Sequence, residues 1–171
     1  MDEAERRAQI ANELERVEES ARISAASQFA LSQQWGTLNI ALGAPASGLA
    51  AAAGVTALAA TTGRIAAGVI ALASAALGGV LTVLNASRKA NQATGAANAY
   101  LEIQTAARQE RLIDSAAREI DDARAELSEL TARRDEQNKS AAPPNRFAYR
   151  RATRGLKDGG QMYQVDIRTE G

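Results

Sequence analysis

The stretch GLAAAAGVTALAATTGRIAAGVIALASAALGGVLTVLNAS, at positions 48–87, contains one charged residue, Arg64. It belongs to a longer region that has no charged side chain from Ile23 to Gly63 and none from Ile65 to Ser87. Such a region forms either a membrane-crossing helical hairpin or the close-packed, alanine-rich core of a soluble bundle. The choice between these two structures decides the fold class.

Length and polarity favour the membrane hairpin. A helix rises about 1.5 Å per residue, so about twenty residues cross a hydrocarbon layer of about 30 Å. The segments 37–60 and 64–87 are both long enough, and TTGR at 61–64 is suited to a tight turn between them. A soluble helix of this length normally carries a polar face. The second segment offers only a few polar side chains, namely Ser74, Thr82, Asn85 and Ser87.

The basic residues predict the orientation of the hairpin. Four of them (Arg6, Arg7, Arg16 and Arg22) precede the first span, Arg64 lies in the turn, and fifteen follow the second span. Positively charged residues stay on the cytoplasmic side of a membrane. We therefore expect both termini in the cytoplasm and the turn on the outside.

The whole chain is predicted to be all-α, a two-helix transmembrane hairpin flanked by cytoplasmic helices. Four segments are expected: an N-terminal amphipathic helix at 1–36, the hairpin at 37–87, one long cytoplasmic helix at 88–138, and a linker with a basic tail at 139–171.

The long cytoplasmic helix carries a short coiled-coil seam. Ile113, Ile120 and Leu127 recur at sevenfold spacing, and Leu130 follows three residues after the last of them. The seam either joins copies of the chain or folds back on the N-terminal helix, and the spacing leaves both arrangements open.

Small residues recur every fourth position in each span. The predicted helix-packing and oligomerisation positions are Ala44, Gly48 and Ala52 in the first span, and Ala67, Ala71, Ala75 and Gly79 in the second. Helices in lipid associate through such close packing. Two helices cannot enclose an aqueous passage, so a pore requires a homo-oligomer. Asn39, Thr56 and Asn85 are the candidate polar positions of a pore or vestibule.

The sequence offers no chemistry for catalysis. Histidine and cysteine are absent, no glycine-rich phosphate loop appears, and neither span contains an acidic residue. We expect no enzyme activity, cofactor or metal. The expected partners are the lipid bilayer, further copies of the chain and a cytoplasmic sensor or signalling protein. The Arg-rich tail around Phe147 and Tyr149 is expected to contact lipid headgroups or to maintain topology rather than to bind nucleic acid.

The segment SRKANQATGAANAYLEIQTAARQERL (87–112) follows the second span and contains Ala97, Tyr100, Leu101 and Arg108. With the preceding small-residue hairpin, it resembles the SLATT domains, two-span membrane effectors associated with bacterial nucleotide-signalling and antiviral conflict systems. The resemblance covers about 5–135. It implies an oligomeric pore-forming or membrane-disrupting effector of antiviral defence (abortive infection), triggered through its cytoplasmic helices. It also implies that the chain lies in the bacterial inner (cytoplasmic) membrane. A membrane-anchored scaffold that recruits a cytoplasmic partner and a phage holin-like lysis protein are the alternatives.

Overall fold

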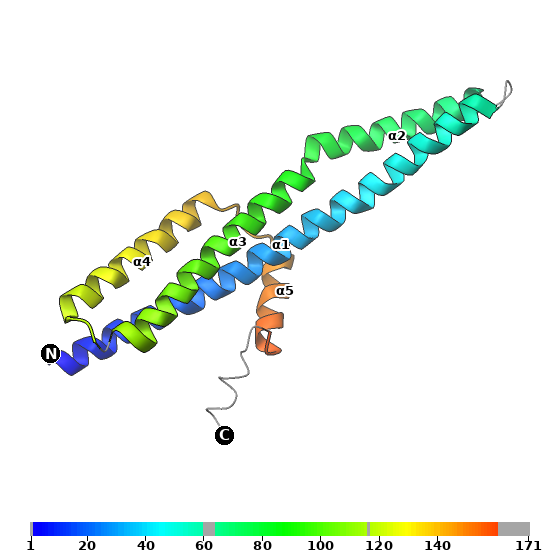
Figure 1. The fold of residues 1–171 in the computed structure, drawn as a ribbon. Coiled ribbons are helices and arrows are strands. Elements are labelled where there is room, and N and C mark those ends of the chain that lie inside the picture. Colours follow the sequence, from blue (N-terminus) through cyan, green and yellow to red (C-terminus); the bar gives the residue numbers. More distant parts are fainter. Residues whose placement is uncertain (1, 60–63, 116, 161–171) are drawn as a thin grey trace. The chain divides into compact units, whose positions relative to one another are not determined.

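The computed structural model describes residues 2–59, 64–115 and 117–160, without the side chains of 56–59 and 64. Over these residues the chain is helical and contains no strand. Its elements, in order, are α1 (Glu3–Ala59), α2 (Arg64–Leu84), α3 (Ala86–Gln109), the π-helix η1 (Glu110–Asp114), α4 (Ile120–Ser140) and α5 (Arg146–Lys157) (Figure 1). The predicted turn at 61–64 lies outside the described residues except for Arg64, which begins α2.

The chain divides into two units, and α1 and α3 contribute to both of them. Unit 1 comprises residues 1–31 and 92–171, and unit 2 comprises residues 32–91. The predicted hairpin, 37–87, therefore falls within unit 2. Two helices, Glu3–Val55 and Ile65–Asp114, are long and apolar enough, by length and composition, to cross a membrane.

The first helix is longer than the sequence predicted. A break was expected near residue 36, but α1 continues without interruption to Ala59. The physical reason is that one glycine, Gly36, disfavours a helix by only about 1 kcal/mol, which is too little to end it. Pro45 also lies inside α1 and lacks an N–H for the carbonyl of Ala41, yet the helix runs through it.

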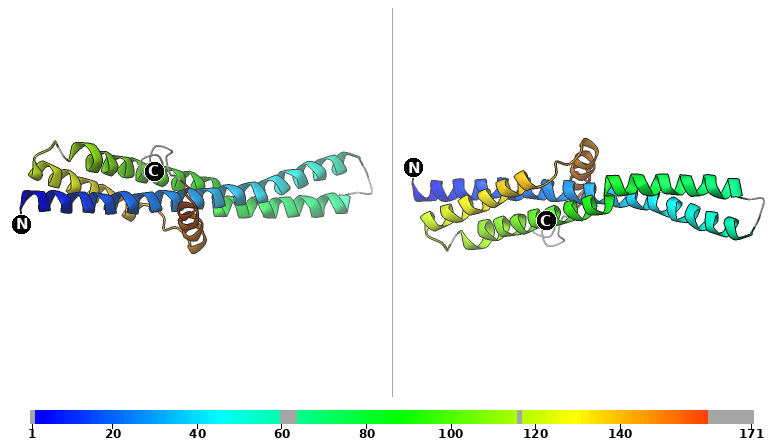
Figure 2. Two further views of the ribbon diagram at one scale, coloured as in Figure 1. Left: turned by 90° about the horizontal axis from the view of Figure 1, so that it is seen from below. Right: turned by 90° about the horizontal axis from the view of Figure 1, so that it is seen from above.

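Unit 1 is built on three helical segments that run side by side (Figures 1 and 2). The first part of α1 presents apolar residues at spacings of four and three, which places them on one face. α3 and α4 cover that face. The resulting core consists of Ile10, Leu14, Val17, Ala21, Ile103, Ala107, Ile120, Ala123 and Leu130, with Ala106 and Leu127 packed against it.

The prediction of one helix over 88–138 is wrong. α3 ends at Gln109, η1 follows, and Glu119 is in an extended conformation before α4 begins. Arg7 of α1 stabilises this break, because its Nη1 donates to the carbonyl oxygens of Ser115 at 2.8 Å and Arg118 at 2.9 Å. The break separates the predicted seam residues: Ile120 and Leu130 are buried in the core and Leu127 packs against it, whereas Ile113 is 67% exposed.

The predicted linker and tail contains a helix that the sequence analysis did not anticipate. Asn145 caps α5, since its Oδ1 accepts a hydrogen bond from the N–H of Ala148 at 2.8 Å. At the other end Gly159 has a positive φ of 83°, and the N–H of Gly160 donates to the carbonyl of Gly155 at 2.8 Å. Pro143 and Pro144 lie between the end of α4 at Ser140 and the start of α5 at Arg146, and they do not prevent this new helix.

The contrast between Leu130 and Ile113 gives a direct test of this packing. Leu130→Ala removes a fully buried side chain from the unit 1 core and is expected to lower the free energy of unfolding by about 2–5 kcal/mol. Ile113→Ala changes an exposed residue of the same predicted seam and is expected to shift it by less than about 0.5 kcal/mol. Denaturant unfolding of the full chain in detergent, followed by circular dichroism, measures both. Equal losses for the two variants would contradict the packing described here.

Candidate functional site

The hairpin of unit 2 pairs the second part of α1 with α2. The hydroxyl of Ser74 donates to the carbonyl oxygen of Ala46 at 2.7 Å, which joins the two helices near their middle. The Leu81 side chain lies 3.7 Å from the position that a Cβ on Gly43 would occupy. Ala46, Ala53 and Ala67 are buried by this pairing. The contact is therefore made by small residues, by the Leu81 side chain beside Gly43 and by one side chain–backbone hydrogen bond.

Seven large apolar side chains of the hairpin are exposed, whereas others, such as Leu42, Leu77 and Leu81, are half-buried. The most exposed are Ile40 (69%), Val55 (68%), Ile65 (84%), Val69 (62%), Leu72 (72%), Val80 (48%) and Val83 (86%). Only 11% of the most apolar window of α1 and 6% of that of α2 and α3 are buried. The core helix of a soluble protein would bury such residues, because each fully exposed Val, Leu or Ile forgoes about 1.5–3 kcal/mol of burial. This surface suits hydrocarbon.

The predicted small-residue positions fall into two groups. In α2, Ala67 is buried and Ala71 and Ala75 line the space between the helices, while Gly79 is exposed. In α1, the predicted positions Ala44, Gly48 and Ala52 are all exposed. They lie on the face of α1 away from α2, because Ala46, Ala50 and Ala53 occupy the near face.

Sequence reasoning missed this second small-residue face of α1. Ala46, Ala50 and Ala53 also follow helical spacing, so the signal was present, but so many alanines in 46–53 fit more than one stripe. Only the position of the partner helix distinguishes the faces.

A hollow of about 600 Å³ lies between α1 and α2. It is lined by Ala50, Ala53, Gly54, Ala67, Gly68, Ala71, Ser74 and Ala75.

The structure describes the side chains of two of the three candidate polar positions. Asn39 is half-buried and Asn85 is exposed. Asn85 has a positive φ of 47°, and this left-handed residue separates α2 from α3. Asparagine tolerates that conformation better than most residues. The side chain of Thr56 lies outside the described residues.

Trp35 and Lys89 meet at the end of the hairpin where α1 enters unit 2. The ammonium nitrogen of Lys89 lies 4.5 Å from the centre of the Trp35 ring, which is a cation–π contact. Tryptophan and lysine together are typical of the level at which a helix passes from hydrocarbon to headgroups. The pair marks one end of the apolar surface.

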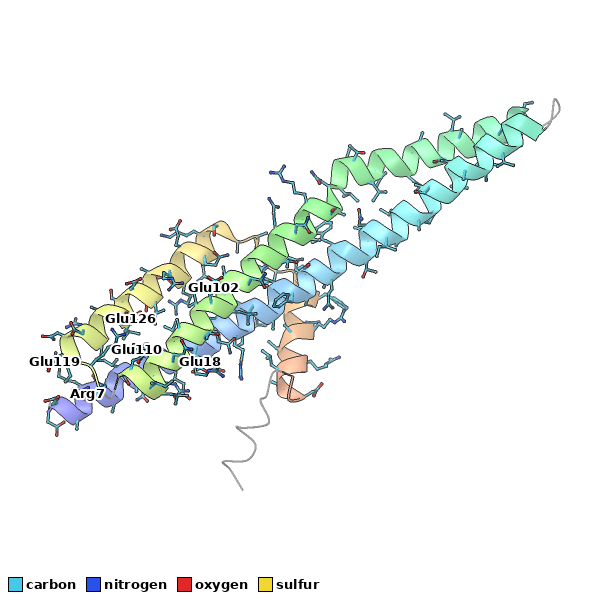
Figure 3. All side chains as sticks on the ribbon, in the orientation of Figure 1. Arg7, Glu18, Glu102, Glu110, Glu119 and Glu126 are labelled. Atoms are coloured by element: carbon cyan, nitrogen blue, oxygen red, sulfur yellow. The ribbon has the colours of Figure 1, made fainter. Side chains whose placement is uncertain are left out.

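Unit 1 contains a buried carboxylate in its π-helix, at the first residue of η1. Glu110 is 3% exposed, and its Oε2 lies 3.3 Å from Nε of Arg118, which also approaches Glu126 at 3.8 Å (Figure 3). Its Oε1 is buried without a hydrogen-bond partner. Burial raises the pKa of Glu110, the positive charge of Arg118 lowers it in part, and the negative charges of Asp114 and Glu126 raise it further.

A second polar cluster of unit 1 surrounds Tyr100. The Tyr100 hydroxyl donates to Oδ1 of Asn138 at 2.7 Å, and burial raises the pKa of this phenol. Nε2 of Gln28 donates to the carbonyl oxygen of Ala142 at 2.7 Å. These bonds border a cavity of about 470 Å³ and tie α1, α3 and α4 to the segment that leads into α5.

The described residues contain no group of three or more acidic, His or Cys side chains able to hold a metal ion. Comparison of the chain with protein-family models, with curated proteins and with solved structures gives no match. The geometry of the two units is therefore the basis for the functional argument that follows.

Glu110 gives a pH-dependent prediction. Its pKa is raised in the folded state, so the folded chain holds this proton more tightly than the unfolded chain. The protonated Glu110 therefore adds to the free energy of unfolding below the ordinary glutamate pKa of 4.5, and this contribution is lost as the pH rises through the raised pKa. Glu110→Gln removes this titration. We expect a higher melting temperature than wild type at pH 7 and a smaller difference near pH 4.

Thermal unfolding at both pH values measures the effect. Glu126→Gln is the control, because this carboxylate is more exposed and lies farther from Arg118. Destabilisation by Glu110→Gln at pH 7 would mean that the ion pair with Arg118 outweighs the burial of the charge.

Proposed function

We propose that this chain is an integral membrane protein whose hairpins assemble into an oligomer that permeabilises the bilayer. The observation that carries the proposal is the outward exposure of the large apolar side chains of unit 2. Leu, Ile and Val each favour insertion by about 0.3–0.6 kcal/mol at the centre of a membrane helix. α2 carries nine such residues between Ile65 and Leu84 and no charge in that range, so it supplies most of this gain.

Assembly is proposed to use two different small-residue surfaces. One is the exposed ridge of α1, made of Ala44, Gly48 and Ala52. The other is the hollow between α1 and α2, which is lined by Ala and Gly together with Ser74. The ridge and the hollow lie on different faces of a hairpin, so the ridge of one copy contacts the hollow of the next and the contact is heterologous. Such a contact repeats from copy to copy, and it closes a ring when the rotation between neighbouring copies adds up to a full turn. Small residues at both surfaces allow the close approach that helix association in lipid requires.

The setting of this activity is proposed from the sequence. The charge distribution supports an orientation with both termini, and hence unit 1, in the cytoplasm. The resemblance to SLATT domains supports a role in antiviral defence, with a cytoplasmic sensor or signalling protein acting on unit 1. Loss of ion gradients through the oligomer would then halt the infected cell.

Gly48→Leu tests the ridge. A Cβ on Gly48 meets no atom within 4 Å, so the larger side chain leaves the hairpin itself undisturbed. We expect dye release from proteoliposomes to fall about tenfold, which corresponds to about 1.4 kcal/mol of lost association. Ala73→Leu is the matched control, because Ala73 is exposed on the face of α2 away from the hollow. It is expected to retain wild-type release.

Cysteine cross-linking tests the geometry of the contact, and the chain has no native cysteine to interfere. The Ser74–Ala46 bond and the shared hollow place Gly48 at nearly the depth of Ala71. Gly48→Cys combined with Ala71→Cys is expected to give disulfide-linked dimers in membranes. A disulfide within one chain is excluded, because Gly48 lies on the side of α1 that faces away from α2. The width of α1, about 10 Å, therefore separates it from Ala71, which is too far for a disulfide.

The control pair is Gly48→Cys with Ala73→Cys, which moves the second thiol about 200° around α2. Equal cross-linking of both pairs would refute the ridge-in-hollow contact.

A membrane-anchored scaffold is the second candidate function. The exposed side chains of Leu112 (62%) and Ile113 (67%) on η1 favour it, because they offer an apolar surface for a partner protein. Absence of dye release by the fully inserted wild-type chain would support the scaffold instead, whereas unchanged release by Gly48→Leu would refute only the ridge.

A further inference from the structure

One face of α5 is strongly cationic. Arg146, Arg150, Arg154 and Lys157 follow one another at spacings of four, four and three, so they form one stripe along the helix. Arg151 lies at the border of this stripe, and Phe147 lies between them. All five cations are exposed, and Phe147 is 66% exposed. The sequence of α5 contains no acidic residue.

The opposite face of α5 holds the helix on unit 1. Ala148 and Ala152 are buried, and the Asn145 cap fixes where the helix starts. Gln28 of α1 ties down the preceding segment through its bond to Ala142. The cationic face is therefore presented outward in a defined orientation.

The charges on this face are not neutralised within the described part of the chain. Other arginines of unit 1 have carboxylate partners, such as Arg111 with Glu18 at 3.0 Å and Arg134 with Asp135 at 2.9 Å. None of the five cations of α5 forms an ion pair with a described carboxylate. A partner with several negative charges would complement this face.

We propose that the cationic face of α5 docks on the anionic phospholipid headgroups of the membrane, with Phe147 inserted between them. A row of arginines attracts anionic lipid, and an aromatic ring at the same level adds apolar burial at the headgroup boundary. The inference rests on the proposed membrane insertion of the hairpin.

Lipid suits this face better than nucleic acid does. Proteins that bind single strands stack successive bases on several aromatic rings, whereas Phe147 is the one aromatic side chain among these cations. Tyr149 lies on another side of the helix and borders the cavity beside Tyr100. One apolar ring within a row of arginines matches insertion into a headgroup layer.

A single-tryptophan reporter tests the proposal. Trp35 is the only tryptophan, so Trp35→Phe with Phe147→Trp leaves one indole at the centre of the cationic face. The full chain is reconstituted in vesicles of phosphatidylcholine alone or of phosphatidylcholine with phosphatidylglycerol. We expect a blue-shifted emission and quenching by brominated lipid only where phosphatidylglycerol is present, and a smaller shift at high salt.

Charge variants in the same background identify the surface. Arg150→Glu with Arg154→Glu is expected to reduce the shift and the quenching to the values found in phosphatidylcholine alone. Arg150→Lys with Arg154→Lys keeps the charges and is expected to keep both signals. The matched control is Arg124→Glu with Arg133→Glu, which reverses two exposed charges on α4 and is expected to change neither signal.

Identical emission in both lipids would overturn the proposal, and so would a response of the indole to single-stranded RNA but not to anionic vesicles. Loss of the signal in the lysine pair would also overturn it, because it would show dependence on arginine geometry rather than charge. Failure of the proposed function can be distinguished from failure of this proposal. A chain that stays monodisperse in buffer without detergent is not an integral membrane protein. If vesicles are then added to that soluble chain, the indole at position 147 still reports whether α5 binds anionic lipid.

Discussion

The constraint on which the structure depends is that two helices enclose no interior. When α2 pairs with the second part of α1, each helix can cover only one side of the other. The small residues Ala46, Ala53 and Ala67 occupy that shared side, and the branched residues Ile65, Val69 and Val83 are left outside. In water this arrangement would expose apolar surface along the whole hairpin. In hydrocarbon the same arrangement is favourable, because lipid supplies the contacts that a third helix would otherwise supply.

Unit 1 shows the opposite solution in the same chain. A third helix, α4, closes over α1 and α3, and the apolar residues of all three turn inward, with Leu14 and Leu130 fully buried. Polar and charged groups then serve the connections between helices. Arg7 accommodates the irregular turn before α4 by donating to the carbonyls of Ser115 and Arg118, and Arg111 joins η1 to Glu18 of α1. Charge is therefore concentrated where water is available and absent where the hairpin faces outward.

The sequence predicted the helical class and the two apolar helices because these follow from composition and periodicity within one segment. It failed where distant residues decide the outcome. The heptad spacing continues from Ile113 to Ile120 without interruption, but Arg7, more than a hundred residues away in sequence, stabilises a break between them. The side of α1 that meets α2 was ambiguous for a similar reason, since alanines surround that helix and only the position of Ser74 distinguishes its faces. α5 had a usable local signal: Asn145 as a cap, alanines at 148 and 152, and Gly159 after the end.

The polar groups of the hairpin limit what an assembly of hairpins would transmit. Ser74 already donates to Ala46, and Thr82 donates to the carbonyl oxygen of Gly78 at 2.9 Å in its own helix. From Ile65 to Leu84 there is no charged side chain. Selective channels use rings of charged side chains or of converging carbonyl groups, and neither is available from these residues. Under the proposed function, a passage lined by methyl groups and glycine backbone would discriminate by size alone. The conduction of both cations and anions, rather than of one selected ion, is therefore what this chemistry favours.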